Sequence, residues 1–367
     1  MMRVFILADP NSIHTRRWIT SLSGYGIDLF LFGVNKHDPS FYNDLRNVEV
    51  YSEDISSGFK GTSVGKIRYL SVLKTLKTKI LQFKPDLLHS HYASSYGLLG
   101  ALVNFHPFVI SVWGSDVYEF PGISLVHRSI LRYVLSKADI ILSTSESMAA
   151  ETRKYTKKTI EITPFGVDSS LFVKDKVPKK ETAIRIGTVK TLDKIYGIDT
   201  LIRSFSIVLA ANKGKNIILE IVGDGPDKEK LVSLARNLGI DGKVLFTGRK
   251  ENSSLPAIYN NFTIFAALSN SESFGVVAIE AMACQCPLVV SDADGFAEVV
   301  TDGYTGFIVP RKNADAAASA LQKFIDNPEL RKKFGTRGRA EVLKKYDWGK
   351  NVELMVSIYK RISTTNQ

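Results

Sequence analysis

Two carboxylates lie in the most unusual segment of this sequence, SESFGVVAIEAMA at residues 271–283. Glu280 falls inside an apolar run, and Glu272 falls just ahead of it. A charge in apolar surroundings is costly unless it is paired, so both acids need partners. In one interpretation a single polar ligand satisfies both. In the other, Glu280 pairs with a buried Arg or Lys, and Glu272 is a solvated loop residue. The residues alone leave both interpretations open.

The start of the helix predicted from Gly275 onward indicates what such a ligand would be. The first N–H groups of a helix lack internal partners and carry partial positive charge, and a glycine lets an anion approach them closely. Glu280 lies about 7.5 Å further along the axis, at about 1.5 Å per residue. A diphosphate at the helix start would place a ribose near Glu280, while Glu272 would reach the hydroxyls of a sugar. This spacing favours a nucleotide-sugar.

Two lysines, Lys190 and Lys194, add positive charge in the loop GTVKTLDKIYG, which follows a predicted strand. Cations in such a loop can stabilise a departing diphosphate. The alternative is a solvated loop in a lysine-rich protein, and spacing alone does not exclude it. The turn GDGP at 223–226 is rich in glycine but lacks the established phosphate-binding patterns.

Short apolar runs alternate with helical patterns along the chain, which is typical of parallel sheets covered by helices on both faces. The alternation occurs in two blocks, separated by the polar segment 173–182. We therefore expect an α/β protein with two doubly wound, Rossmann-like domains, at residues 1–172 and 183–347. A last helix at 348–367 is expected to pack back on the first domain.

Polar and glycine-containing loops follow the predicted strands in both blocks. Ligands of doubly wound sheets bind beyond the carboxyl ends of the strands. If the two sets of loops face each other, they form a deep cleft, with a ligand site on each side. The loops in question are 8–14, 89–95 and 111–116 in the first block and 187–194, 222–227 and 269–276 in the second.

Composition excludes several other classes of function. No apolar run approaches the roughly 20 residues of a membrane span, and the N-terminus MMRVFILADP has a strand pattern rather than that of a signal peptide. The net charge of +11 suits a phosphorylated ligand or an anionic lipid surface. No zinc-finger spacing or basic region with heptads points to nucleic acid. Cys284 and Cys286 are too few for a disulfide framework, so we expect buried thiols and a cytoplasmic protein.

Several motifs, in a fixed order, resemble a known family. The segments GTVK, YGIDTLI, IVGDGPDKEKL, VLFTG, ESFGVVAIEAMA and EVVTDGYTGFIVP, within about residues 184–310, resemble the second domain of the family 4 retaining glycosyltransferases. These enzymes have a GT-B-type fold. DPNSIHTRRW, PDLLHSHYASSYG and VWGSD, within about residues 1–170, more loosely resemble a bacterial subgroup that builds surface polysaccharides such as capsule or lipopolysaccharide.

By position, this resemblance assigns roles to the residues of a donor site. Glu272 would act in catalysis by holding the hydroxyls of the donor sugar, and Glu280 would bind the ribose. Lys194, together with Lys190, would neutralise the departing diphosphate. The remaining donor-binding residues would be Phe274 and Gly275 at the sugar, Val276 and Val277 at the phosphate, and Arg249 and Lys250 at the base.

The chain departs from the family pattern at three positions. Thr188 stands where an arginine is usual, and Lys190 is its expected substitute. Gln285 stands where a glycine is usual. Trp113 replaces a histidine that is thought to lie near the reacting carbon, and His91 is the candidate for its role. In the mechanism usually proposed for the family a donor phosphate oxygen takes the acceptor's proton, so this histidine need not be replaced.

The acceptor is expected on the first domain, at Ser12, His14, Trp113 and Asp116. His14, at a predicted helix start, is equally well explained as part of a helix cap. Asp116 could likewise cap the segment that follows it, but contact with an acceptor hydroxyl is favoured. His89 and His91 alternate along a strand and suggest a metal, but the family needs none. We therefore expect neither a metal nor another cofactor.

A basic helix is predicted at residues 64–83. Either it is an ordinary surface helix docked by its apolar stripe, or its basic residues also hold the protein at the inner face of the cell membrane. In the second case each basic residue contributes about 1 kcal/mol on an anionic leaflet. The stripe consists of Ile67, Leu70, Leu73, Leu76 and Ile80, the basic residues are Lys66, Arg68, Lys74, Lys77 and Lys79, and no acid occurs from Lys60 to Lys84.

The sequence therefore predicts a retaining glycosyltransferase that moves a sugar from a nucleotide-sugar to a hydroxyl of a glycan or polyprenyl-linked acceptor. A UDP-sugar is favoured as donor and a GDP-sugar is second. One alternative is a non-catalytic subunit that binds a sugar nucleotide, which the replacement at Trp113 would suit. Another is a nucleotide-sugar epimerase, which would need no acceptor.

Overall fold

The chain forms two compact units, which are described separately. The computed structural model describes residues 1–54, 63–175 and 183–364 and, of 63–71, the backbone only. The first unit contains Met1–Pro164 and Lys350–Gln367, and the second contains Phe165–Gly349. The division falls after Pro164, ahead of the segment 173–182 where we expected it.

The first unit is built on a seven-stranded parallel sheet with the strand order β3-β2-β1-β4-β5-β6-β7. Chain order therefore reverses between β1 and β4, where consecutive connections leave in opposite directions. The strands are β1 (Arg3–Leu7), β2 (Asp28–Gly33), β3 (Val48–Ser52), β4 (Leu87–His91), β5 (Phe108–Val112), β6 (Ile140–Ser143) and β7 (Ile160–Ile162). The inner strands β1, β2, β4, β5 and β6 are almost wholly buried on both faces, which is typical of a parallel sheet, whereas the edge strands β3 and β7 are partly exposed.

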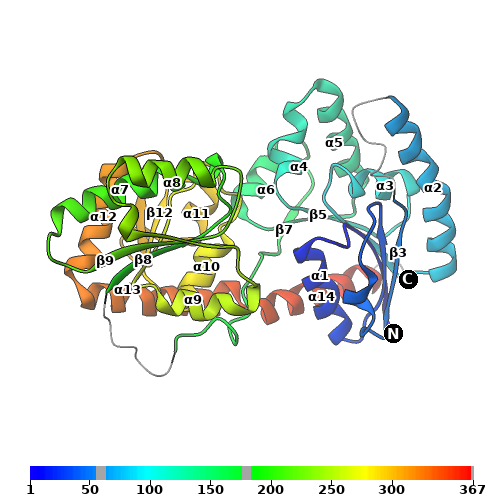
Figure 1. The fold of residues 1–367 in the computed structure, drawn as a ribbon. Coiled ribbons are helices and arrows are strands. Elements are labelled where there is room, and N and C mark those ends of the chain that lie inside the picture. Colours follow the sequence, from blue (N-terminus) through cyan, green and yellow to red (C-terminus); the bar gives the residue numbers. More distant parts are fainter. Residues whose placement is uncertain (55–62, 176–182, 365–367) are drawn as a thin grey trace. The chain divides into compact units, whose positions relative to one another are not determined.

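Helices cover both faces of this sheet (Figure 1). Phe5 and Leu7 alternate with Val4 and Ile6 along β1 and point to the face that packs against α2, α3 and α5. The helices are α1 (Ile13–Gly24), α2 (Ser63–Phe83), α3 (Tyr96–Val103), α4 (Ser115–Tyr118), α5 (Leu125–Lys137), α6 (Glu146–Thr152) and α14 (Trp348–Thr364). Of the apolar stripe that was predicted for the helix at residues 64–83, Leu76 and Ile80 are buried in this core.

The last helix, α14, is joined to the first unit by polar contacts as well as by apolar packing. Its Tyr359 hydroxyl lies 2.5 Å from Nδ1 of His89 in β4. Its Arg361 forms an ion pair with Glu161 in β7. Asn351 donates from its side-chain amide to the carbonyl of Pro164. The C-terminal helix is thus part of the first unit's core.

The second unit is built on a six-stranded parallel sheet with the order β10-β9-β8-β11-β12-β13. Here the reversal lies between β8 and β11. The strands are β8 (Ile184–Val189), β9 (Ile217–Val222), β10 (Val244–Gly248), β11 (Ile264–Ala267), β12 (Leu288–Ser291) and β13 (Gly306–Val309). The helices are α7 (Ile198–Ala211), α8 (Lys228–Asn237), α9 (Leu255–Asn261), α10 (Val276–Ala283), α11 (Asp294–Val299), α12 (Ala314–Asp326) and α13 (Pro328–Glu341).

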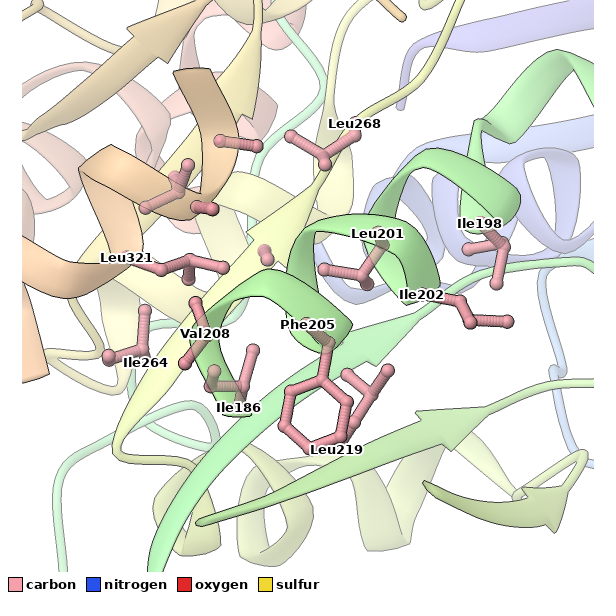
Figure 2. Packing of buried hydrophobic residues seen from close by; sticks show 14 of the residues in the cluster. Ile186, Ile198, Leu201, Ile202, Phe205, Val208, Leu219, Ile264, Leu268 and Leu321 are labelled. Atoms are coloured by element: carbon pink, nitrogen blue, oxygen red, sulfur yellow. The ribbon is translucent and has the colours of Figure 1, made fainter. Parts of the chain in front are cut away.

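The core of the second unit forms where α7 lies on the sheet. Leu201, Phe205 and Val208, spaced at three and four residues, present one apolar face of this helix. Figure 2 shows Phe205 beside Leu219 of β9, with the side chain of Leu321 of α12 nearby. Burying a side chain of this size contributes about 1.5–3 kcal/mol, so this face anchors the helix and the loop before it.

Both strand orders are those of doubly wound sheets, which confirms the predicted class of two Rossmann-like α/β domains. In the portion of the chain that the structure describes, no helix is long and apolar enough to cross a bilayer.

Candidate functional site

The strand reversal in the second unit brings two loops together, one after β8 and one after β11. Lys190 comes from the first loop and Glu272 from the second. Lys190 Nζ lies 2.6 Å from Glu272 Oε2, and the two side chains are 12% and 10% exposed. Ser269 also donates to this carboxylate oxygen, at 3.4 Å. A mostly buried ion pair therefore sits where doubly wound sheets bind ligands.

Glycines hold the lysine-bearing loop in place. A Cβ on Gly223 would lie 1.9 Å from the Lys190 carbonyl oxygen, and one on Gly197 would lie 2.0 Å from that of Leu268. Lys190 N–H donates to the carbonyl of Val222 in β9. The GDGP turn that begins at Gly223 thus supports the loop of Lys190, and its glycine is required by close packing of the backbone.

Helix α10 begins at Val276, four residues after Glu272. Gly275 precedes the helix with a φ of 91°, in the left-handed region that favours glycine. The N–H groups of Ala278 and Ile279 donate back to the Gly275 carbonyl. Those of Val276 and Val277 have no acceptor among the described residues, so the helix end retains free donors and its partial positive charge. Phe274 is buried between the rings of Phe165 and Tyr346 and fixes this end of the helix.

Glu280 lies in the interior of the second unit, and sequence reasoning missed one of its partners. The hydroxyl of Tyr259, in α9, donates to Glu280 Oε2 at 2.7 Å. Tyr259 is fully buried, and Glu280 is 9% exposed. Burial, reinforced by the neighbouring Glu280 carboxylate, raises the pKa of Tyr259 well above its usual range, so the phenol stays protonated and donates. A buried aromatic residue in a helix gives no sequence signal for this role.

The other basic candidates of the second unit are exposed. Lys194 is in the same loop as Lys190, and its carbonyl accepts from the side chain of Asn270 in the facing loop. Arg249 and Lys250 follow β10. Within the described ranges, no hydrogen bond or ion pair connects the side chains of these three residues to the Lys190–Glu272 pair.

The reversal in the first unit creates a second polar site. A cavity of about 320 Å³ lies beyond the carboxyl ends of β1 and β4, and Ser12, Thr15, His91 and Trp113 are among its lining residues. Nδ1 of His91 and Oγ1 of Thr15 are buried and have no hydrogen-bond partner in the described structure. Buried polar atoms are normally satisfied, so this cavity suits a polar ligand.

Aromatic and imidazole rings line one side of this cavity. The ring centroid of Trp113 lies 4.5 Å from that of His91 and 5.9 Å from that of His14. Burial, with a smaller effect of charge on His14, lowers the pKa of His91 to about 3. Burial and the charge of Arg17 lower the pKa of His14 to about 4. Both imidazoles are therefore neutral near pH 7, and His91 can exchange hydrogen bonds but carries no charge.

The neighbouring His89 has a structural environment. Its two ring nitrogens lie within hydrogen-bond distance of the hydroxyls of Tyr359 and Ser111. His89 and His91 share one face of β4, with ring centroids 4.6 Å apart. Among the described residues there is no group of three or more His, Cys, Asp or Glu that could hold a metal ion.

Asp116 does not fit the expected contact with an acceptor. Its side chain has no exposed surface. The carboxylate accepts the backbone N–H groups of Ala93, Trp113 and Gly114. Asp116 therefore ties together the loops after β4 and β5 and sets the position of Trp113. It does not cap the segment that follows it either, because helix α4 has no side-chain cap hydrogen bond and the N–H groups of Ala93, Trp113 and Gly114 precede it in the chain.

Comparisons with known proteins agree with this architecture. Residues 170–341 match the family model of the glycosyl transferases group 1, and residues 3–145 match the glycosyl transferase 4-like model. An uncharacterized glycosyltransferase of Methanocaldococcus jannaschii is 25% identical over 346 residues, covering 90% of each chain. The capsular polysaccharide biosynthesis glycosyltransferase CapM of Staphylococcus aureus is 28% identical over 311 residues, covering 76% of this chain and 78% of CapM.

Solved structures show the same fold. Sucrose-phosphate synthase of Thermosynechococcus elongatus superposes with a TM-score of 0.81 and 19% identity, with both chains fully covered. HepE of Anabaena, in complex with UDP and glucose, superposes with a TM-score of 0.78 and 16% identity, covering 98% of this chain and all of HepE.

The fold and the matched models define a glycosyltransferase with two Rossmann-like domains. More specifically, the chain belongs to the family 4 glycosyltransferases, which have the GT-B fold.

Proposed function

We propose that this protein is a retaining glycosyltransferase that transfers a sugar from a nucleotide-sugar to a hydroxyl of a glycan or a lipid-linked acceptor. The observation that carries this proposal is the arrangement around α10: an ion pair of Lys190 and Glu272 ahead of the helix, free N–H groups at its start, and the buried Glu280 within it. A nucleotide-sugar has groups that match each of these features in the same order.

In this proposal the diphosphate lies at the start of α10. The N–H groups of Val276 and Val277 point toward it, and the helix end favours its negative charge. Glu280 accepts hydrogen bonds from the ribose and is kept in position by Tyr259. The base lies toward the loop after β10, where Arg249 and Lys250 offer backbone groups. Phe274 and Gly275 do the same for the donor sugar.

The chemistry requires that the bond between sugar and diphosphate breaks and that the leaving group is stabilised. Lys190 and Lys194 supply positive charge for the diphosphate, which is most useful when the charge develops in the transition state. Glu272 holds hydroxyls of the sugar and so orients its anomeric carbon. A phosphate oxygen of the donor accepts the proton of the attacking hydroxyl on the same face, so the configuration at that carbon is retained. No metal or other cofactor is part of this proposal.

The cavity of the first unit is proposed to bind the acceptor. Ser12 lines it just ahead of α1, His14 lies behind the lining against the ring of Trp113, and Trp113 offers a ring face on which a sugar can stack. Neutral His91 has an unsatisfied Nδ1 that can bond a sugar hydroxyl. Asp116 contributes indirectly, because it fixes the backbone at Trp113.

Relatives guide the choice of substrates. CapM is named for capsular polysaccharide biosynthesis, and HepE was solved with UDP and glucose. We therefore favour a UDP-sugar, with a GDP-sugar second, and an acceptor used in bacterial surface polysaccharide synthesis. A polyprenyl-linked acceptor would bring the protein to the inner face of the cell membrane.

The α2 lysines were predicted to assist such membrane attachment. Lys74 and Lys77 are exposed, whereas Lys79 lies over the ring of Tyr51 at 4.8 Å. The other basic residues of that prediction, Lys60, Lys66 and Arg68, lie outside the described side chains, as do Ile67 and Leu70 of the apolar stripe. The described lysines are compatible with electrostatic attraction to anionic lipid.

The experiment that tests the function has two steps. A panel of UDP- and GDP-sugars is first screened for thermal stabilisation, because a ligand that binds only the folded state raises the midpoint. The best donor is then incubated with glycan and polyprenyl-phosphate acceptors, and the anomeric configuration of the product is read by NMR.

The proposal expects transfer with retention of configuration. Conversion of the donor alone into another nucleotide-sugar would indicate an epimerase. Tight donor binding without transfer to any acceptor would favour a non-catalytic binding subunit.

A further inference from the structure

The first unit exposes large apolar side chains on α5 and on the turn before it. Ile123 is 65% exposed, Leu125 is 76%, Val126 is 62% and Tyr133 is 39%. Single exposed apolar residues are ordinary, but a contiguous group indicates an interaction surface. We call Ile123, Leu125, Val126, Ile130 and Tyr133 the α5 patch.

The patch is not a by-product of the way α5 packs on the sheet. Leu131, Val134 and Leu135 are fully buried in the core of the first unit and define the inward face of the helix. At 100° per residue, Leu125 and Tyr133 fall on the opposite face. A groove of about 400 Å³ runs along this outward face, lined by Leu125, Val126, Ser129, Ile130 and Tyr133. Ile130 lies at the border and packs partly against the core, whereas Leu125, Val126 and Tyr133 are exposed, so the helix has a second apolar face that the fold uses only at its edge.

The charged side chains of α5 and of the turn before it all have one sign. No Asp or Glu occurs between Glu119 and Asp139. Arg128 and Arg132 are exposed on α5 and form no ion pair within the described part of the chain. Lys137 lies over the ring of Tyr133 at 5.8 Å, so positive charge borders the apolar surface directly.

We propose that the α5 patch docks on an anionic lipid surface, with its apolar side chains inserted at the headgroup boundary and its arginines on the lipid phosphates. Branched aliphatic and aromatic residues beside cations are the combination by which interfacial helices bind membranes. The arginines can pair with phosphate through two parallel hydrogen bonds.

The same charges argue against a second copy of this chain as the occupant. In a two-fold symmetric dimer the patch would face itself, because the same surface is used on both subunits. Arg128 and Arg132 would then approach their own copies without an intervening acid, which is unfavourable at a dehydrated contact. An anionic bilayer offers complementary charge and an apolar phase together.

The patch also complements the basic residues of α2. Helix α3 contacts both α2 and α5, so the three helices form one layer on the same face of the sheet. Lys74 and Lys77 on α2 can supply long-range attraction, while the α5 patch supplies insertion. This inference does not depend on the donor site, and it gives the proposed membrane-borne acceptor a defined docking surface.

The test is flotation of the purified full chain with phosphatidylcholine vesicles that contain or lack phosphatidylglycerol. Binding is expected only with the anionic lipid. The double variants Leu125→Ser/Val126→Ser and Arg128→Glu/Arg132→Glu should each lower the partition coefficient at least tenfold. Ile207→Ser is the control, because Ile207 is an exposed apolar residue (39%) on α7 of the second unit, which is not one of the helices of the proposed surface, and should not change binding. Circular dichroism and UDP binding verify that each variant is folded.

A local probe separates insertion from simple attraction. Val126→Cys can be labelled with an environment-sensitive dye, since the native cysteines are both buried. Its fluorescence should rise and shift to the blue with anionic vesicles, and a dye at Ile207→Cys, on α7 of the second unit, should not respond. An unresponsive dye at residue 126, or undiminished flotation of both double variants, would overturn the proposal. So would a wild-type dimer in solution that Leu125→Ser/Val126→Ser dissociates.

If the donor assignment is wrong, UDP will not raise the thermal midpoint of the protein, whereas its flotation with anionic vesicles will be unchanged.

Discussion

The ion pair between Lys190 and Glu272 provides the sharpest test of the donor site, and replacing either partner should reduce both stability and transfer. The Nζ–Oε2 distance is 2.6 Å, and about nine-tenths of each side chain is shielded from water. Removing one partner of a fully buried pair costs about 3–5 kcal/mol, whereas an exposed pair contributes about 0–1 kcal/mol. With the residual exposure discounted, we expect Lys190→Met to cost about 2–3 kcal/mol.

This loss should appear as a lower thermal midpoint. One kcal/mol corresponds to about 2–4 °C for a unit of this size, so the midpoint should fall by about 5–10 °C. Glu272→Gln leaves an uncompensated lysine and should have a comparable effect. The double variant should be more stable than the sum of the single losses predicts, with a coupling energy of about 2 kcal/mol.

The matched control is the pair of Arg185 and Glu220 in β8 and β9 of the same unit. Its N–O distance is 2.7 Å, but the side chains are 31% and 15% exposed, and Arg185 lies at the amino end of its strand. Breaking this pair should cost less, and Arg185→Met should leave transfer intact.

Activity then decides whether the pair serves the donor. Glu272→Ala should lower turnover by about 10²-fold or more, because misplacement at the reacting carbon has penalties of that order. Near-normal turnover in that variant would refute the assignment of Glu272. A coupling energy below about 0.5 kcal/mol would show that the contact is no stronger than an exposed pair.

Three further predictions concern other residues of the two sites. Lys194→Gln should slow transfer about tenfold or more while UDP affinity changes little, since a lysine that acts on the leaving group contributes mainly in the transition state; equal losses would indicate simple ground-state binding. Glu280→Ala should chiefly weaken UDP binding, and Tyr259→Phe should weaken it less, by up to about tenfold, since a hydrogen bond to a charged group contributes about 1.5–3 kcal/mol; unchanged calorimetric affinities would contradict this. Burial lowers the pKa of His91 to about 3, so the unfolded chain binds a proton that the folded chain does not, and stability should fall as pH drops from about 6.5 toward 3. His91→Gln should reduce that slope by up to about 1.4 kcal/mol per pH unit, the limit reached below the unfolded pKa of about 6.5, as measured by urea unfolding between pH 6 and 4.

Sequence reasoning predicted that the two loops of the proposed donor site lie at the same sheet edge, because their positions follow from a general property of parallel sheets. Lys190 and Glu272 are 82 residues apart, yet Lys190 directly follows β8, Glu272 lies in the loop after β11, and these two strands are neighbours at the reversal of strand order. Alternating apolar runs predict the strands but not their order. That order, and hence the 2.6 Å contact, depended on the tertiary structure.

Other features could not be predicted because local pattern does not distinguish their alternatives. Asp116 has the same neighbours in the sequence whether it caps a loop or faces a ligand, and only its complete burial decides. The contact of Tyr259 with Glu280 joins two helices, and the contact of His89 with Tyr359 spans 270 residues. Each requires an aromatic hydroxyl at one point of a core, for which no spacing rule exists.

The backbone conformation explains why a glycine is usual at the position of Gln285, one of the departures from the family pattern. Gln285 has a φ of 59°, in the left-handed region that disfavours residues with a side chain, so a glycine is the usual choice there. A Cβ on Gly335 would lie 2.1 Å from the Gln285 carbonyl oxygen, so the facing helix α13 holds this turn closely. The chain therefore keeps the conformation but tolerates a strained residue in it.

The replacement of the usual arginine by Thr188 has a different structural explanation. Residues two apart in a strand point to the same side, so Thr188 and Lys190 share a direction at the end of β8. Thr188 is 1% exposed, and its hydroxyl has no partner among the described residues, so this position offers no room for a solvated cation. Lys190 stands one step beyond the strand, where a flexible side chain reaches Glu272. A positive charge is thus present at the sheet edge two residues later in the chain, which supports the proposal that Lys190 substitutes for the usual arginine.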